Sequence, residues 1–234
     1  MSRPEHSPGP SSLDPEKVAY WYFRLNGFLQ IENFIVHPGG RGGQRTDADL
    51  LAVRFPHRAE RLIDNPDDIM ADDADGLNLS RDLIDVVIAE VKANQPCTLN
   101  GPWTTPGREN VHRVLAAIGC VPRAEIHDAA AQIYRTGIYR SFSGLQVRLV
   151  AVGSRRADAV ASLYPDVTQV TWPDLLEFVF SRLQRYRHQK QQVDQWDPTG
   201  KALRSLAGRF HPEPAGFIEA VQLRMAAHVR GGAR

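Results

Sequence analysis

The spacing of hydrophobic residues changes along the chain and predicts which parts are helical and which are extended. Residues 14–25 carry apolar side chains on helical spacing, with Pro15 suited to a first turn and Gly27 to a helix stop. A later β-rich run has no polar side chain from Val86 to Ala89. Continuous apolar runs of this kind are typical of strands buried on both faces. The pattern therefore predicts an N-terminal helix followed by strands, one of them fully buried.

The same rules give the remaining elements. Strands are predicted at residues 28–36, 46–55, 83–92, 145–152 and 167–171. Helices are predicted at residues 111–118, 124–134, 174–190, 200–207 and 214–229. This order predicts an α/β or α+β fold, in which helices flank a mixed sheet and a helical extension follows at the C-terminus.

Composition divides the chain into three predicted parts. Residues 1–12 are rich in Pro and Ser and are expected to form a disordered tail. Residues 13–171 are expected to form the sheet core, and residues 172–234 the helical C-terminal extension. Within the core, residues from about 57 to 80 are crowded with Asp and show little periodicity. A loop of this length is either functional or mobile, so we expect a solvated, mobile insertion here.

The overall composition is that of an ordinary globular protein. Of 234 residues, 42% are hydrophobic, and the formal net charge of +1 supplies no global field toward nucleic acid or membranes, so any binding surface must be a local patch. The two cysteines, Cys97 and Cys120, lack the spacing of a zinc motif or a disulfide framework. No apolar stretch approaches the roughly 20 residues that a spanning helix requires. We therefore expect a cytoplasmic chain without a membrane partner.

Charged residues stand where two predicted strands begin and end. Asp49 opens the strand at residues 46–55, while Glu90 and Lys92 close the buried strand and share one face of it. If the two strands pair antiparallel, Asp49 lies beside Glu90 and Lys92. Two carboxylates in such a position suit Mg²⁺, and the amine could position water or stabilise phosphate charge. The alternative is a solvated strand end with an ordinary cross-strand ion pair.

This combination resembles the PD-(D/E)xK nuclease superfamily. The matching positions are Asp49 at a strand start, Glu90-Val91-Lys92 at the next strand's end, and Glu16 on the preceding helix. The resemblance covers roughly residues 14 to 152 and implies a restriction-endonuclease-like fold. It implies that Asp49, Glu90 and the backbone carbonyl of Val91 hold Mg²⁺ or Mn²⁺, that Lys92 positions a water, and that Glu16 is a further catalytic residue. Glu16 is equally explained by the dipole of its helix.

Several arginines are candidates for nucleic-acid contact. Arg41 and Arg45 belong to a glycine-rich loop, and Arg182, Arg185 and Arg187 to a predicted C-terminal helix. The alternatives are a flexible hairpin loop and a solvated helix face. Just beyond the candidate site, Trp103 could stack on a base or anchor its loop to the core.

These observations predict a Mg²⁺-dependent nuclease that hydrolyses phosphodiester bonds of DNA, in bacterial defence, restriction or repair. A second hypothesis is a catalytically idle nuclease-fold subunit that binds nucleic acid or a protein partner. A third is a nuclease directed at RNA, since nothing in the residues separates the two substrates. A homodimer or protein partner held through the C-terminal helices is also considered.

Overall fold

A computed structural model describes residues 12–37, 45–60 and 69–232. The helices, in chain order, are α1 (Pro15–Leu25), α2 (Gly101–Thr104), the 3-10 helix η1 (Pro106–Arg108), α3 (Asn110–Ile118), α4 (Ile126–Thr136), α5 (Asp158–Leu163), α6 (Trp172–Arg185), α7 (Pro198–Arg209) and α8 (Pro214–Gly232). The strands are β1 (Leu29–Val36), β2 (Thr46–Arg54), β3 (Ile84–Val91), β4 (Ile138–Arg140), β5 (Leu145–Gly153) and β6 (Thr168–Thr171).

The six strands of the described chain form one mixed sheet. Its order is β1-β2-β3-β5-β4, with β6 also paired to β5. β1, β2 and β3 form an antiparallel meander, whereas β3 and β5 are parallel and are joined through α2, α3 and α4. In the β2–β3 pair, Leu50 lies opposite Ala89. The antiparallel pairing expected for these two strands is thus confirmed, and it brings the start of β2 to the end of β3.

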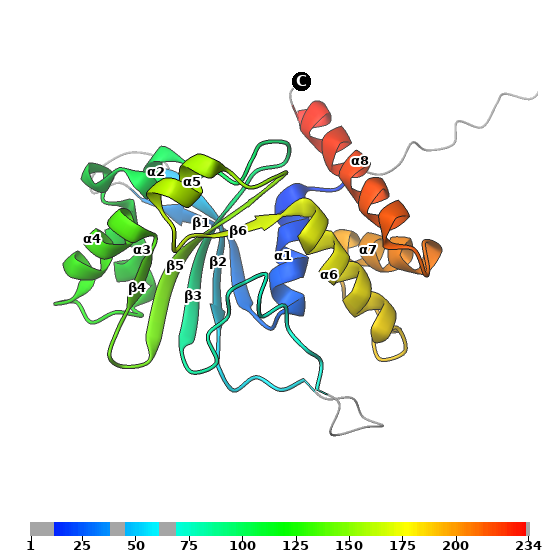
Figure 1. Cartoon of the computed structure of the whole chain (residues 1–234), viewed down its shortest axis with the longest axis horizontal. Coiled ribbons are helices and arrows are strands. Elements are labelled where there is room, and N and C mark those ends of the chain that lie inside the picture. Colours follow the sequence, from blue (N-terminus) through cyan, green and yellow to red (C-terminus); the bar gives the residue numbers. More distant parts are fainter. Residues whose placement is uncertain (1–11, 38–44, 61–68, 233–234) are drawn as a thin grey trace, which may run out of the picture.

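Helices cover both faces of the sheet (Figure 1). α3 and α4 lie on one face, over a core that includes Ile88, Leu115 and Leu149. α1 and α6 lie on the other face, and α7 and α8 pack outside them, so that Phe23 of α1 and Phe217 of α8 belong to one core. The structure therefore confirms a mixed sheet flanked by helices, and its C-terminal helices share the core of α1.

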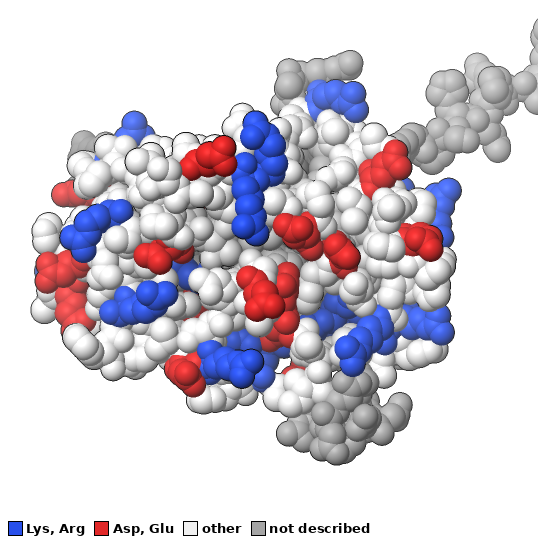
Figure 2. All heavy atoms as spheres, in the orientation of Figure 1, with Lys and Arg blue, Asp and Glu red and all other residues white. Residues whose placement is uncertain are grey.

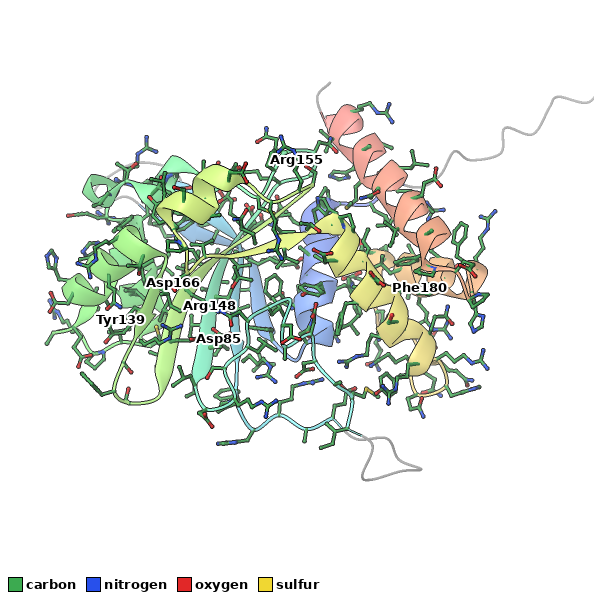
Figure 3. The ribbon with its side chains drawn as sticks, in the orientation of Figure 1. Asp85, Tyr139, Arg148, Arg155, Asp166 and Phe180 are labelled. Atoms are coloured by element: carbon green, nitrogen blue, oxygen red, sulfur yellow. The ribbon has the colours of Figure 1, made fainter. Side chains whose placement is uncertain are left out.

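A buried ion pair joins the two central strands. Asp85 of β3 and Arg148 of β5 point toward one another (Figure 3), and each side chain is about 1% exposed. Arg148 donates from Nε and Nη2 to the two Asp85 oxygens at 2.9 and 2.8 Å, and from Nη1 to Thr168 at 2.7 Å. Because its donors and acceptors are matched, this pair fixes β3 against β5 without leaving a buried charge uncompensated.

The acid-rich segment departs from its prediction as a solvated, mobile insertion. Residues 61–68 lie outside the described part, but several of residues 69–80 contact the fold, while Ile69 and four others are exposed. Met70 and Leu77 are buried, and the Tyr22 hydroxyl donates a hydrogen bond to Asp73 at 2.7 Å. The prediction is wrong for the part of this stretch in which Met70 and Leu77 are buried and Asp72 and Asp73 pair with Arg54 and Tyr22.

Four short elements escaped the sequence patterns, namely α2, η1, β4 and α5. In the described part of the chain, no helix combines the length and the apolar character needed to cross a membrane.

Candidate active site at the β2–β3 edge

Asp49 is fixed to the end of β3 by a hydrogen bond. Extending the β2–β3 register by one residue places Asp49 opposite Glu90. There the Asp49 side chain, rather than a backbone carbonyl of β2, accepts the hydrogen bond of the Val91 N–H at 2.6 Å. The carboxylate is thereby held against the Glu90-Val91-Lys92 segment, and the sequence prediction that these residues converge is confirmed.

Glu90 is the most deeply buried carboxylate of this group, with 3% of its surface exposed. The Trp103 indole N–H donates to one carboxylate oxygen at 2.8 Å, while the Asn100 amide and the Lys92 ammonium both donate to the other. A buried carboxylate persists only with such compensation. Glu90 is therefore held in one orientation by donors from β3 and from the loop leading into α2.

Lys92 is anchored through its backbone as well as its side chain. Its N–H donates to the Val152 carbonyl of β5 at 2.9 Å. Its carbonyl accepts a hydrogen bond at 3.0 Å from the indole of Trp172, the first residue of α6. The start of α6 therefore braces the segment that carries the candidate lysine.

Two carboxyl groups of the site titrate near neutrality. Burial, together with the nearby charge of Glu90, raises the pKa of Asp49 to about 6. Burial raises the pKa of Glu16 to about 7, and Asp49 is the largest of the charges that add to this shift. Asp14 and Asp47 add smaller contributions to Glu16. Glu16 therefore lies within electrostatic reach of Asp49, whereas Asp49, Glu90 and Lys92 are joined by direct hydrogen bonds.

The donor set fits a hard divalent cation. Mg²⁺ binds one or two carboxylates and completes its shell with water and substrate phosphate. Asp49 and Glu90 supply two carboxylates at adjacent register positions, and their mutual repulsion favours a cation between them. Within the described residues, no group of three or more His, Cys, Asp or Glu side chains is arranged to hold a metal. A cation here would rely on these two carboxylates, the Val91 carbonyl and water.

Asn100 and Trp103 contribute to the site as hydrogen-bond donors to Glu90, a role that the sequence did not predict for either residue. Trp103 is 1% exposed and directs its indole N–H at Glu90, so it anchors its loop and does not offer a face for base stacking. The only sequence signal was its position shortly after the Glu90-Val91-Lys92 segment.

Among the described residues, none of the arginines predicted to contact nucleic acid bonds to Asp49, Glu90 or Lys92. Arg41 lies outside the described residues. Arg45 is exposed and immediately precedes β2, where its N–H donates to the Val36 carbonyl. Arg182 is a correction: it is 3% exposed and bonds to the Ala71 carbonyl and to Asp72, so the prediction that it reaches a phosphate backbone from an outer helix face is wrong. Arg185, the last residue of α6, and Arg187, two residues beyond it, are exposed.

No family model, no curated protein and no solved structure matches the chain. The functional argument therefore rests on the residues of the site.

Proposed function

We propose that the chain is a metal-dependent nuclease of the PD-(D/E)xK type that hydrolyses phosphodiester bonds of DNA. The observation that carries the proposal is the convergence of Asp49, Glu90 and Lys92 at one edge of the sheet. The order of elements around it, with Glu16 on the helix before the meander, agrees with the resemblance seen in the sequence. Bacterial defence, restriction or repair are the settings this activity suits.

Each residue has a role that follows from its chemistry. Asp49, Glu90 and the Val91 carbonyl would hold a divalent cation, which when bound supplies Lewis-acid stabilisation of phosphate charge. Lys92 orients the attacking water and stabilises negative charge as it grows on the phosphate. Glu16, with its pKa near 7, is able to take up or release a proton at the working pH.

A second function is favoured by one specific observation. Glu90 accepts hydrogen bonds from Lys92, Asn100 and Trp103 and is almost fully buried. A carboxylate held in this way is also compatible with a catalytically idle nuclease-fold subunit that binds nucleic acid or a protein partner. The two functions differ in whether bound nucleic acid is cut.

The test is incubation of the purified chain with supercoiled plasmid, linear duplex, single-stranded DNA and RNA. Each substrate is supplied with Mg²⁺, with Mn²⁺ or with chelator. The proposal expects DNA cleavage that requires the metal and disappears in Lys92→Ala, with Lys201→Ala, an exposed lysine on α7, as the matched control. Metal-independent binding without cleavage would instead establish the idle subunit, and preferential cleavage of RNA would change the substrate.

A further inference from the structure

Two adjacent arginines follow β5 at the edge of the sheet that carries the candidate site. β3 and β5 are parallel, so their carboxyl ends lie at the same edge, and Ala151 of β5 lies opposite Glu90 of β3. Arg155 is four residues beyond Ala151, at most about 14 Å of chain, and Arg156 comes next. Figure 3 shows Arg155 beyond the end of β5. Both arginines therefore lie at the sheet edge that holds Glu90.

Backbone contacts fix the start of this arginine pair against the loop that follows β3. The Ser154 N–H donates to the Gln95 carbonyl at 2.8 Å. The Arg155 carbonyl accepts a hydrogen bond from the Cys97 N–H, also at 2.8 Å. Gly153 permits this close approach, because a Cβ at that position would lie 2.6 Å from the backbone nitrogen of Cys97. The fold itself therefore sets where the arginine pair stands relative to the site.

The side chains of the arginine pair are free to meet a ligand. Arg155 and Arg156 are exposed, and within the described parts of the chain neither guanidinium makes a hydrogen bond or an ion pair. Arg54 and Arg148, by contrast, are buried and paired with aspartates. A guanidinium presents five N–H donors in a planar fork that matches the oxygens of a phosphate. The pair thus offers two unused positive charges beside the candidate site.

The candidate site itself is acidic. Burial raises the pKa of Glu16 to about 7, and the charges of Asp49 and Asp14 add to this shift, which shows that carboxylates gather here. Such a site repels a polyanion unless positive charge stands close by. Figure 2 shows Lys and Arg side chains on the surface where β5 ends. The arginine pair therefore supplies the charge that a nucleic-acid backbone requires at this edge.

We propose that Arg155 and Arg156 bind the backbone of the DNA substrate at a phosphate that flanks the one to be cut. This inference rests on the proposed nuclease function. It places the DNA strand across the carboxyl ends of β3 and β5, with the scissile phosphate at Glu90 and Lys92. Contacts to phosphate position nucleic acid without reading its sequence, so the pair contributes affinity and no sequence preference.

The test measures binding of a labelled DNA duplex to the full chain in chelator, where the metal-dependent cut does not occur, over a range of salt concentrations. The double variant Arg155→Ala, Arg156→Ala should bind about tenfold more weakly at low salt. Its plot of log affinity against log salt concentration should lose about one unit of slope for each phosphate contact removed. The double variant Arg155→Lys, Arg156→Lys should keep the wild-type slope, because lysine retains the charge.

The matched control removes two exposed arginines from the opposite edge of the sheet. It is the double variant Arg81→Ala, Arg140→Ala. Arg81 lies shortly before β3 begins, and Arg140 lies opposite Gln146 near the start of β5. This variant changes the net charge by the same amount and should bind DNA as wild type does.

Cleavage in Mg²⁺ separates binding from chemistry. The Arg155→Ala, Arg156→Ala variant should raise KM about tenfold and leave kcat within about twofold of wild type, because the pair binds substrate away from the reacting atoms. Wild-type affinity and salt slope in this variant, or an equal loss in the control, would overturn the inference even if wild type cuts DNA. Binding that depends on the two arginines, without any cleavage by wild type, would support the site and overturn only the nuclease proposal.

Discussion

The Asp49 carboxylate accepts a hydrogen bond from the Val91 backbone N–H at 2.6 Å. One side chain thereby completes the pairing of two strands and also presents a charge to the Glu90-Val91-Lys92 segment. The structural part of this role needs only an acceptor oxygen, whereas the chemical part needs the negative charge. Substitutions can separate the two.

Asp49→Asn should therefore fold with nearly wild-type stability, because its amide oxygen can still accept from Val91. Asp49→Ala leaves that N–H without its partner and should lower the free energy of unfolding by about 1–3 kcal/mol. Urea unfolding of both variants checks this, with exposed Asp82→Ala as the control. Equal stability of the Asn and Ala variants would contradict the structural role of the hydrogen bond.

Trp103→Phe should weaken the hold on Glu90. It deletes the donor to one buried carboxylate oxygen, so we expect a loss of about 1.5–3 kcal/mol in the free energy of unfolding and a lower cleavage rate. Trp196→Phe is the control, because the Trp196 ring packs on Trp21 and not on Glu90, which is distant in the sequence. If both variants lose the same stability and activity, the indole hydrogen bond is not what orients Glu90.

Glu16 makes stability depend on pH near neutrality. Its pKa is raised from 4.5 to about 7, so the folded chain binds this proton more tightly than the unfolded chain does. The resulting stability is present below pH 4.5 and is lost as pH rises through about 7. In chelator, Glu16→Gln should therefore gain on the order of 1 kcal/mol over wild type at pH 8, a value reduced by solvent screening, and nothing at pH 4. A difference independent of pH would show that Glu16 is not coupled to the cluster.

The packed part of the acid-rich segment should be structural. Deletion of residues 62–76 removes Met70 and Asp72, and Asp72 compensates Arg54, Arg58 and Arg182. Removing the partner of buried charges typically costs about 3–5 kcal/mol, so the deletion should lower the melting temperature strongly. Thermal unfolding decides this, and an unchanged melting temperature would restore the interpretation of a solvated insertion.

Sequence patterns predicted the parts of the fold that depend on local periodicity. The apolar centre from Val86 to Ala89 indicated a buried strand, and charges at adjacent strand ends indicated that Asp49 and Glu90 meet. β4 has three residues, too few for a period to emerge. The helical pattern around Arg182 predicted an exposed side chain. Its partner Asp72 lies 110 residues earlier in the sequence, and periodicity does not reveal such a contact.

Local sequence patterns also do not reveal the residues that support Glu90. Asn100 and Trp103 follow Glu90 by 10 and 13 residues, in a loop whose Pro and Gly residues predict only a change of direction. Their role depends on the path that the loop takes back over the sheet.

Calorimetric titration of Mn²⁺ into wild type, Asp49→Asn and Lys92→Ala, paired with the cleavage rate of each, tests the central claim most directly. The proposed roles predict that both variants lose cleavage, but that only Asp49→Asn loses at least tenfold in metal affinity. Lys92→Ala should bind Mn²⁺ as well as wild type or better, because a positive charge beside Glu90 is removed. Full cleavage by either variant, or equal metal affinity in wild type and Asp49→Asn, would contradict the assignment of this edge as a metal-dependent catalytic site.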